Sequence, residues 1–287
     1  MRTPALIGLL AGATCIALSP IWVRVSDVGP TASAFWRVAL AVPMLWLLFA
    51  FTSRHRKTLD KGQYLPLLLA GIAFAGDLVF WHWSIQYTSV ANSTLLANLA
   101  SIFVTLAAWL LWKQRPSGLF LAGLAAALVG VALLVRASLD STPRALLGDG
   151  LGIVTAMFYA WYLLSVKDLR DGGAGTLQLM AVTTSVTGFI LLPIAIASGE
   201  LFLPAGANGW LVLLGLAWIS HAAGQGLIAY ALAHLPAGFS SVGLLFQPVM
   251  AALFAWALLG EPLVALQVAG GAVVLAGIYM ARKASGQ

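Results

Sequence analysis

The chain has 287 residues, of which 61% are hydrophobic and only 8% are charged, and its formal net charge is +6. Soluble domains carry about 25% charged residues, so these charges are too few to cover a water-exposed surface of this size. The composition excludes a soluble domain and predicts an all-α protein that spans a membrane. A positive inner face explains the net charge, so no nucleic-acid partner is expected.

Ten stretches are long and apolar enough to cross a bilayer as helices, because a spanning helix needs about 20 apolar residues. Their approximate ranges are 4–23, 30–51, 64–83, 89–112, 117–136, 148–166, 176–198, 209–233, 236–259 and 264–281. Pro, Gly or charged residues separate most of them. The breaks with the fewest polar residues lie around Thr88 and Pro236.

An internal repeat relates the two halves of the chain. Residues 87–136 align without a gap with residues 234–283, each position meeting the one 147 further on. The identical pairs include Ser93 with Ser240, Leu106 with Leu253, Trp109 with Trp256, Gly123 with Gly270, and Gly130 with Gly277. Such repeats are typical of membrane transporters. We therefore expect two domains, residues 1–140 and 141–287, each with five helices.

Lysine and arginine residues predict the orientation of these halves. If the amino terminus is cytoplasmic, eleven of these residues lie in inner segments and three in outer segments. The inner residues are Arg2, Arg54, Arg56, Lys57, Lys61, Lys113, Arg115, Lys167, Arg170, Arg282 and Lys283, and the outer ones are Arg24, Arg136 and Arg144. Inner loops are enriched in these residues, so both termini should be cytoplasmic. Because five is odd, the second half must be inverted, which predicts two inverted repeats around a central cavity.

Two charged residues lie deep in the predicted spans, Arg37 in the second and Asp77 in the third. A charge within the bilayer costs about 3 kcal/mol on insertion scales, so each needs a partner or a function. Both lie at a similar depth below the outer ends of their helices. One interpretation is a structural ion pair, or an Arg37 packed near the outer surface. The other is that Asp77 binds a substrate ammonium group or a proton, while Arg37 meets a carboxylate.

Polar side chains form a stripe along each of four predicted helices. These stripes are Asp77, Trp81 and Ser84; Thr94, Asn98, Ser101 and Thr105; Thr155, Tyr159 and Tyr162; and Trp218, His221 and Gln225. A single hydroxyl group in a membrane helix usually bonds to its own backbone, but four stripes favour a shared, water-filled cavity. The predicted substrate-binding residues are Asp77, Trp81, Asn98, Tyr159, Tyr162, His221 and Gln225. For His221 the alternative is a structural role.

Glycine residues recur in the fifth and tenth spans. They are Gly123, Gly130, Gly270, Gly271 and Gly277. Glycine permits close approach of membrane helices, so these residues indicate packing. The two glycine-rich helices should then lie at the back of each half.

Several motifs resemble those of a known family. The first half contains residues 34–40 (AFWRVAL) and 84–93 (SIQYTSVANS), and the second contains 237–241 (AGFSS), Gln247-Pro248 and 259–262 (LGEP). With these motifs the chain resembles the drug/metabolite transporter superfamily, in its ten-helix EamA-type branch, over nearly its whole length. The family's fourth-helix proline and the glutamate at the end of that helix appear in the second half as Pro248 and Glu261. In the first half these positions hold Ser101 and Gln114.

The unequal halves should therefore bend differently, because Pro248 cannot donate to its helix ladder and Ser101 can. We expect Pro248 to act as a hinge. We also expect the two halves to have different roles. The second half would contain the hinge, and the first half, which holds Arg37 and Asp77, would bind the substrate.

The resemblance implies export or exchange of a small organic metabolite. Among subfamilies, the chain is most similar to bacterial amino-acid exporters, including the aromatic amino-acid group. Where that group has aromatic residues in its fourth helix, this chain has Asn98 and Ala100. We expect a secondary transporter that exports small metabolites, above all amino acids, across a bacterial-type inner membrane by alternating access. The alternatives are export of drugs or nucleotide-sugar-type metabolites, and a membrane-embedded enzyme.

An enzyme would need clustered His, Asp or Glu residues at ligand or general-base spacing. The four histidines form no such cluster in the sequence. We therefore expect no catalytic residue, no metal and no cofactor, and no P-loop is visible that would bind ATP. The expected partners are a small-molecule substrate and the lipid bilayer. The oligomeric state is left open, and a monomer would suffice.

Overall fold

The computed structural model describes residues 2–52, 61–88, 90–135, 142–260 and 262–286, and in this part of the chain every regular element is a helix. The elements are α1 (Arg2–Ala17), α2 (Ser19–Val25), α3 (Pro30–Ala39), α4 (Ala41–Thr52), the 3₁₀ helix η1 (Lys61–Gln63), α5 (Tyr64–Tyr87), α6 (Val90–Ala97), α7 (Ala100–Trp112), α8 (Gly118–Val135), α9 (Pro143–Asp171), α10 (Thr176–Ala197), α11 (Ala207–Gly215), the π-helix η2 (Leu216–Gln225), α12 (Gly226–Leu232), α13 (Ala237–Gly243), α14 (Phe246–Leu259) and α15 (Ala265–Ala284).

Nine helical segments of the described residues are long and apolar enough to cross a membrane, and Gly118–Leu134 is a shorter apolar helix. The prediction of an all-α, ten-helix membrane protein is confirmed. The sixth span is longer than the expected 148–166, because α9 begins at Pro143. There, the Thr142 hydroxyl accepts a hydrogen bond from Ala145 N at 3.3 Å and caps the helix, and proline suits a first turn.

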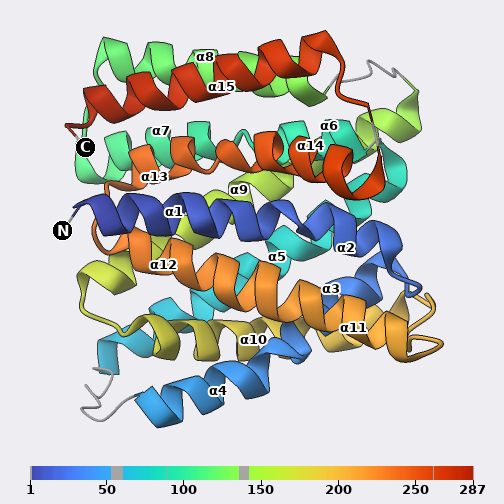
Figure 1. Ribbon diagram of the computed structural model, residues 1–287. Coiled ribbons are helices and arrows are strands. Elements are labelled where there is room, and N and C mark those ends of the chain that lie inside the picture. Colours follow the sequence, from blue (N-terminus) through green and yellow to red (C-terminus); the bar gives the residue numbers. More distant parts are fainter. Residues whose placement is uncertain (1, 53–60, 89, 136–141, 261, 287) are drawn as a thin grey trace.

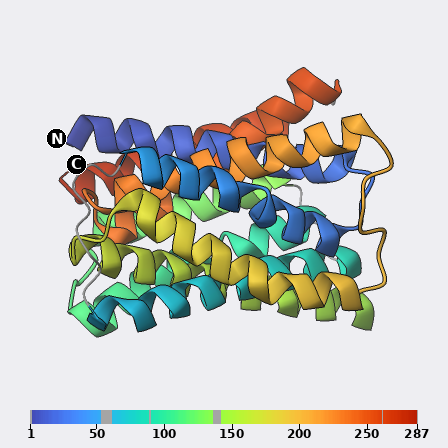
Figure 2. The same ribbon diagram turned by 90° about the horizontal axis from the view of Figure 1, so that it is seen from below.

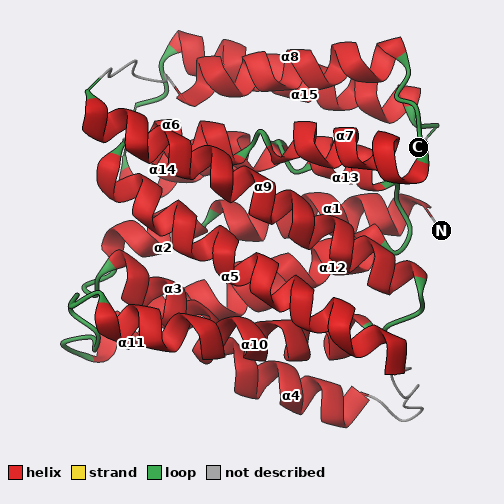
Figure 3. Ribbon diagram, turned by 180° about the vertical axis from the view of Figure 1, so that it is seen from behind, coloured by secondary structure: helices red, strands yellow, loops and turns green. Residues whose placement is uncertain are grey.

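The helices run side by side in one bundle, with α8 and α15 at one edge and α4 at the opposite edge (Figure 1, and from behind in Figure 3). The start of α1 and the end of α15 lie at the same end of the bundle, as both Figure 1 and Figure 2 show. Both termini therefore lie on one side. The charge bias predicts that this side is the cytoplasm. Four of the residues that give this bias lie outside the described residues: Arg54, Arg56, Lys57 and Arg136. Glu261 of the family motif also lies outside them.

Glycines hold α8 and α15 together at two crossing points. A Cβ atom added to Gly130 would lie 2.7 Å from the carbonyl oxygen of Gly270, and one added to Gly277 would lie 2.5 Å from that of Gly123. These distances are too short for any side chain, so only glycine permits this approach. The predicted packing role of these four glycines is confirmed.

Two backbone features recur at nearly the same offset as the sequence repeat. The α7 and α14 helices both end on a left-handed residue, Lys113 with φ 54° and Gly260 with φ 68°. The fourth span is interrupted at residues 98–99, between α6 and α7, and the ninth at residues 244–245, between α13 and α14. Division of the chain into domains 1–140 and 141–287 stays a prediction, with which these shared features agree.

The interruption in the first half occurs without a proline. The Ser101 hydroxyl donates to the carbonyl oxygen of Asn98 at 3.0 Å, and Ser101 N also bonds this oxygen, at 3.3 Å, in the tighter pattern of a 3₁₀ turn. We expected the halves to bend differently because only Pro248 lacks an N–H group. Instead, both helices are interrupted at this level, because a serine hydroxyl group competes for the same carbonyl.

Enlarging Gly277 tests the α8–α15 contact. Gly277→Leu should lower stability by about 1–3 kcal/mol, since overpacking forces the two backbones apart, and the melting temperature in detergent should fall. Gly150→Leu is the matched control, because nothing lies within 4 Å of a Cβ atom added to Gly150. Equal melting temperatures for the two variants would show that the contact does not hold the helices together.

A candidate substrate cavity at the centre of the bundle

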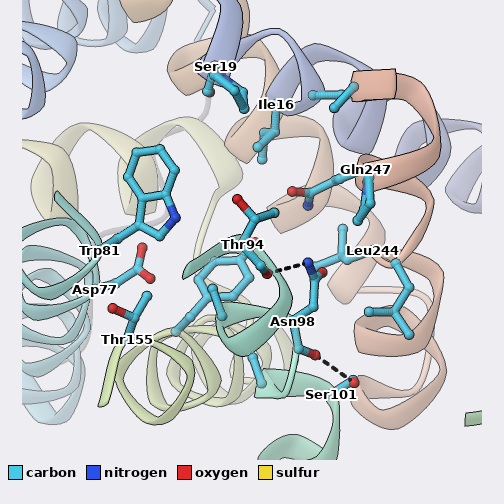
Figure 4. Close-up of a pocket in the computed structure, with 18 of the residues that line it drawn as sticks. Ile16, Ser19, Asp77, Trp81, Thr94, Asn98, Ser101, Thr155, Leu244 and Gln247 are labelled. Atoms are coloured by element: carbon cyan, nitrogen blue, oxygen red, sulfur yellow. Dashed lines mark hydrogen bonds between the residues drawn. The ribbon is translucent and has the colours of Figure 1, made fainter. Parts of the chain in front are cut away.

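A cavity of about 140 Å³ lies among the helices near the middle of the bundle. It is enclosed by side chains from α1, α2, α3, α5, α6, α7, α9, η2, α13 and α14 and from the two helix interruptions. Seven of the nine residues predicted for the site line it: Arg37, Asp77, Trp81, Asn98, Tyr159, Gln225 and Pro248. Figure 4 shows Asp77 and Gln247 on opposite sides of this cavity.

Arg37 and Asp77 line the same cavity, yet they do not form a direct salt bridge. Arg37 is only 6% exposed, and its Nε atom has no hydrogen-bond partner among the described residues. The two side chains interact electrostatically, but no nitrogen–oxygen distance between them falls within 4.0 Å. The predicted contact ion pair is therefore not formed in this structure, because both groups face the intervening space.

The position of Arg37 depends on how α3 is anchored at its other end. The Glu200 carboxylate, in the loop after α10, accepts hydrogen bonds from Thr31 N at 2.7 Å and from the Thr31 hydroxyl group at 2.9 Å. Gln86 Nε2 at the end of α5 donates to the same carboxylate at 3.0 Å. A carboxylate at a helix N-terminus satisfies the free backbone N–H groups there. Glu200 thus fixes the ten-residue helix whose last turn carries Arg37.

Three neutral polar side chains also line the cavity. They are Tyr159 on α9, Gln225 on η2 and Gln247 on α14, and Tyr159 interacts with both amides. Gln225 is only 3% exposed, and its Oε1 atom has no hydrogen-bond partner in the described part of the chain. Gln225 lies on a π-helix, a rare conformation that frequently occurs at functional sites.

Asn98 lies in the interruption between α6 and α7. Its Nδ2 atom donates to the backbone oxygen of Thr94 at 2.7 Å, and its own backbone oxygen accepts from Ser101 (Figure 4). Irregular backbone within a membrane is tolerated where it lines a cavity. All three of these residues do line it.

Two predicted residues do not reach the cavity. Tyr162 is 2% exposed, packs against the Phe74 ring at 4.7 Å and directs its hydroxyl group to the Met180 sulfur at 3.9 Å. His221 bonds the Thr184 hydroxyl group at 2.9 Å through Nε2 and stacks on Phe74 at 5.3 Å. Both side chains are buried and lie outside the cavity lining, where they pack between α5, α9, α10 and η2, although the His221 Nδ1 atom has no hydrogen-bond partner in the described residues. For His221, this is the structural alternative.

Within the aligned repeat, five pairs of residues separated by the repeat offset line the cavity, one member of each pair from each half. The pairs are Thr94 with Ser241, Ala97 with Leu244, Asn98 with Leu245, Ala100 with Gln247, and Ser101 with Pro248. In the sequence, Gln247 stands out only as part of the family motif. The repeat offset pairs it with Ala100, which lies between Asn98 and Ser101 of the polar stripe, and both paired residues line the cavity.

A second, wider cavity of about 500 Å³ adjoins the first. The two share Pro20, Trp81, Thr94, Pro248 and Ala251 as lining residues. The wider cavity continues to Arg24 and Pro262, at the end of the bundle where α2 ends and α15 begins. This end lies opposite the termini, and the charge bias predicts that it is the outer side. The two cavities together extend from the centre of the bundle toward this end.

A ten-helix bundle around a central cavity lined by both polar and apolar side chains defines the class: a multi-pass membrane protein. In the described residues, no group of three or more His, Cys, Asp or Glu residues could hold a metal ion. The EamA-like transporter family matches residues 3–136 and 146–282. The chain belongs to this family, so it is a transporter and not an enzyme.

Curated relatives agree with this assignment. The chain is 24% identical to the pseudopaline exporter CntI of Pseudomonas aeruginosa, over 100% of this chain and 98% of the relative. It is 25% identical to a protein of Salmonella typhimurium named as a probable amino-acid metabolite efflux pump, over 84% of each. A transporter of Archaeoglobus fulgidus is 27% identical over 91% of this chain and 90% of its own length. A solved crystal structure, 14% identical, shares the fold over 99% of this chain and 98% of its own, with a TM-score of 0.83.

Cysteine labelling tests the outer route. In a Cys15→Ser background, which removes the single cysteine of the chain, Thr94→Cys should react with a membrane-impermeant thiol reagent added outside whole cells. Thr183→Cys, 2% exposed and outside the cavity, is the matched control and should stay unlabelled. Labelling of Thr94→Cys only in inside-out vesicles would reverse the assignment of the open side.

Proposed function

We propose that this protein is a secondary carrier that exports small zwitterionic metabolites, above all amino acids, across a bacterial inner membrane by alternating access. The observation that carries the proposal is the pair Arg37 and Asp77. These opposite charges line one cavity and have no salt bridge to each other. An ammonium group at Asp77 and a carboxylate at Arg37 would satisfy both.

Energetics favour an overall neutral substrate with separated charges. Each isolated charge in a water-poor interior is costly, and pairing with a partner of opposite sign reduces that cost. A zwitterion adds no net charge to the cavity, yet it supplies one partner to each side chain. Truncating one partner leaves the other buried and unpaired, so recognition by both charges should be strict.

The relatives support the same substrate class at a coarser level. One is named an exporter of pseudopaline, and another is named for efflux of amino-acid metabolites. Both names describe the outward movement of a small metabolite. Outward movement is also the direction for which we propose the present carrier.

The cavity gives less support to the alternative substrates. Drug-sized ligands usually occupy pockets of about 300–1,000 Å³. The central cavity, which holds Arg37 and Asp77, is smaller at about 140 Å³, and only the adjoining cavity of about 500 Å³ reaches this range. A nucleotide sugar would need several cations for its phosphates, and Arg37 is the one cation among the described residues that line the central cavity. A small zwitterion fits both constraints.

Alternating access requires the cavity to open to each side in turn. In this structure the route leads toward Arg24, which is the outer end in our proposed orientation with cytoplasmic termini. The interruptions at residues 98–99 and 244–245 both border the cavity. We propose that Pro248, one turn after the second interruption, is a hinge there, since its helix lacks one backbone hydrogen bond.

Transport in proteoliposomes tests the substrate class. Purified protein in liposomes loaded with single labelled amino acids should show efflux or exchange of at least one of them, because the cavity holds a partner for each α-substituent. Protein-free liposomes are the control. Failure to move any of the twenty amino acids would overturn the amino-acid assignment.

Neutral substitutions test the two charges. Asp77→Asn and Arg37→Gln should each lower transport efficiency by about 10- to 100-fold, the effect of losing a charged hydrogen bond. Lys283→Gln and Asp168→Asn, charge changes outside the cavity, are the matched controls and should transport normally. Asp77→Asn should also abolish any proton dependence of transport. An unchanged rate and pH profile would return Asp77 to a structural role.

A further inference from the structure

We infer that the cavity selects zwitterions whose side chain carries a hydrogen-bond donor, and that the Gln225 side-chain oxygen accepts the hydrogen bond from this donor. This inference rests on the proposed function, since it concerns the part of the substrate that Arg37 and Asp77 do not hold. The substrate class is then hydroxyl- or amide-bearing amino acids rather than aliphatic or aromatic ones.

Gln225 has a buried amide oxygen that no described residue satisfies. Its side chain is 97% buried and lines the cavity, as does Tyr159, with which it interacts. Its Oε1 atom has no hydrogen-bond partner in the described residues. A buried amide oxygen without a partner costs about 1–3 kcal/mol. A donor supplied by the substrate would remove that cost.

The surroundings of Gln225 restrict its amide. The side chain is buried, and Tyr159 interacts with both Gln225 and Gln247, so polar groups from α9, η2 and α14 act on one another here. A side chain held in place in this way loses little entropy on binding a ligand. It therefore discriminates between ligands better than a mobile one.

The charged and neutral walls of the cavity have different roles in this arrangement. Figure 4 shows Asp77 and Gln247 on opposite sides. A zwitterion held at Arg37 and Asp77 by its two α-substituents would leave its side chain to the neutral polar groups that line the same cavity, Gln225 and Gln247 among them. A site built to bond a hydroxyl group rejects the analogue that lacks it, because its own polar group stays unpaired.

Threonine and valine provide the matched substrate pair, since they differ by a hydroxyl group in place of a methyl group. In proteoliposomes, wild-type protein should transport threonine with an efficiency about 10-fold above that of valine, the effect of one hydrogen bond of about 1.4 kcal/mol. Gln225→Leu should bring this ratio to about one or below, and Gln225→Glu, which keeps an acceptor, should retain the preference.

Two further variants test whether a change in the ratio comes from the cavity rather than from misfolding or from any glutamine-to-leucine substitution. Tyr159→Phe removes only the hydroxyl group that interacts with Gln225, and it should lower the threonine-to-valine ratio. Gln178→Leu, the same substitution on α10 outside the cavity, should leave the ratio unchanged.

The outcomes separate this inference from the proposed function. If the wild type transports amino acids but prefers valine, or if Gln225→Leu transports with an unchanged ratio, the inference fails and the zwitterion carrier stands. If no amino acid is transported, both fail. A ratio that falls only in the two cavity variants supports both.

Discussion

Hydrocarbon cannot hydrogen-bond a polar group, and this constraint explains where every informative residue of the protein lies. Arg37 and Asp77 would each be costly against lipid, and both face one cavity. Irregular backbone at a helix interruption is also costly in lipid. The interruptions lie at residues 98–99 and 244–245, and residues 98 and 244–245 border the same cavity. Charges, amides and irregular backbone therefore gather at one place. That place is a candidate binding site because the bilayer excludes these groups everywhere else.

The same constraint sets how much of the protein was predictable from its sequence. The helical spans follow from composition alone, and the polar stripes mark the faces that avoid lipid. A stripe does not distinguish a cavity from a packed interior, because both keep polar groups away from hydrocarbon. Tyr159 and Tyr162 belong to one stripe, yet the first lines the cavity and the second is buried against Phe74. Gln225 and His221 differ in the same way.

Other features depend on contacts that no local pattern encodes. Glu200 lies in a loop and caps the start of α3 at Thr31, which is 169 residues away in the sequence. No motif around Glu200 predicts this role. The sequence from Leu216 to Gln225 carries no signal for a π-helix. The two halves were expected to bend differently because Ser101 stands where the second half has Pro248, but both helices are interrupted at this level, and the Ser101 hydroxyl group bonds to the backbone oxygen of Asn98.

The two walls of the cavity combine equivalent positions with unequal chemistry. Five lining pairs are separated by 147 residues, but Asn98 is matched by Leu245 and Gln247 by Ala100. The buried charges come from the first 140 residues and the glutamines from the remainder. The expected division between a binding half and a hinge half therefore needs revision, since both halves supply cavity residues and both contain an interruption. A site with identical walls would accept a zwitterion in two opposite orientations. Unequal walls favour one orientation, in which the α-substituents meet charge and the side chain meets the amides.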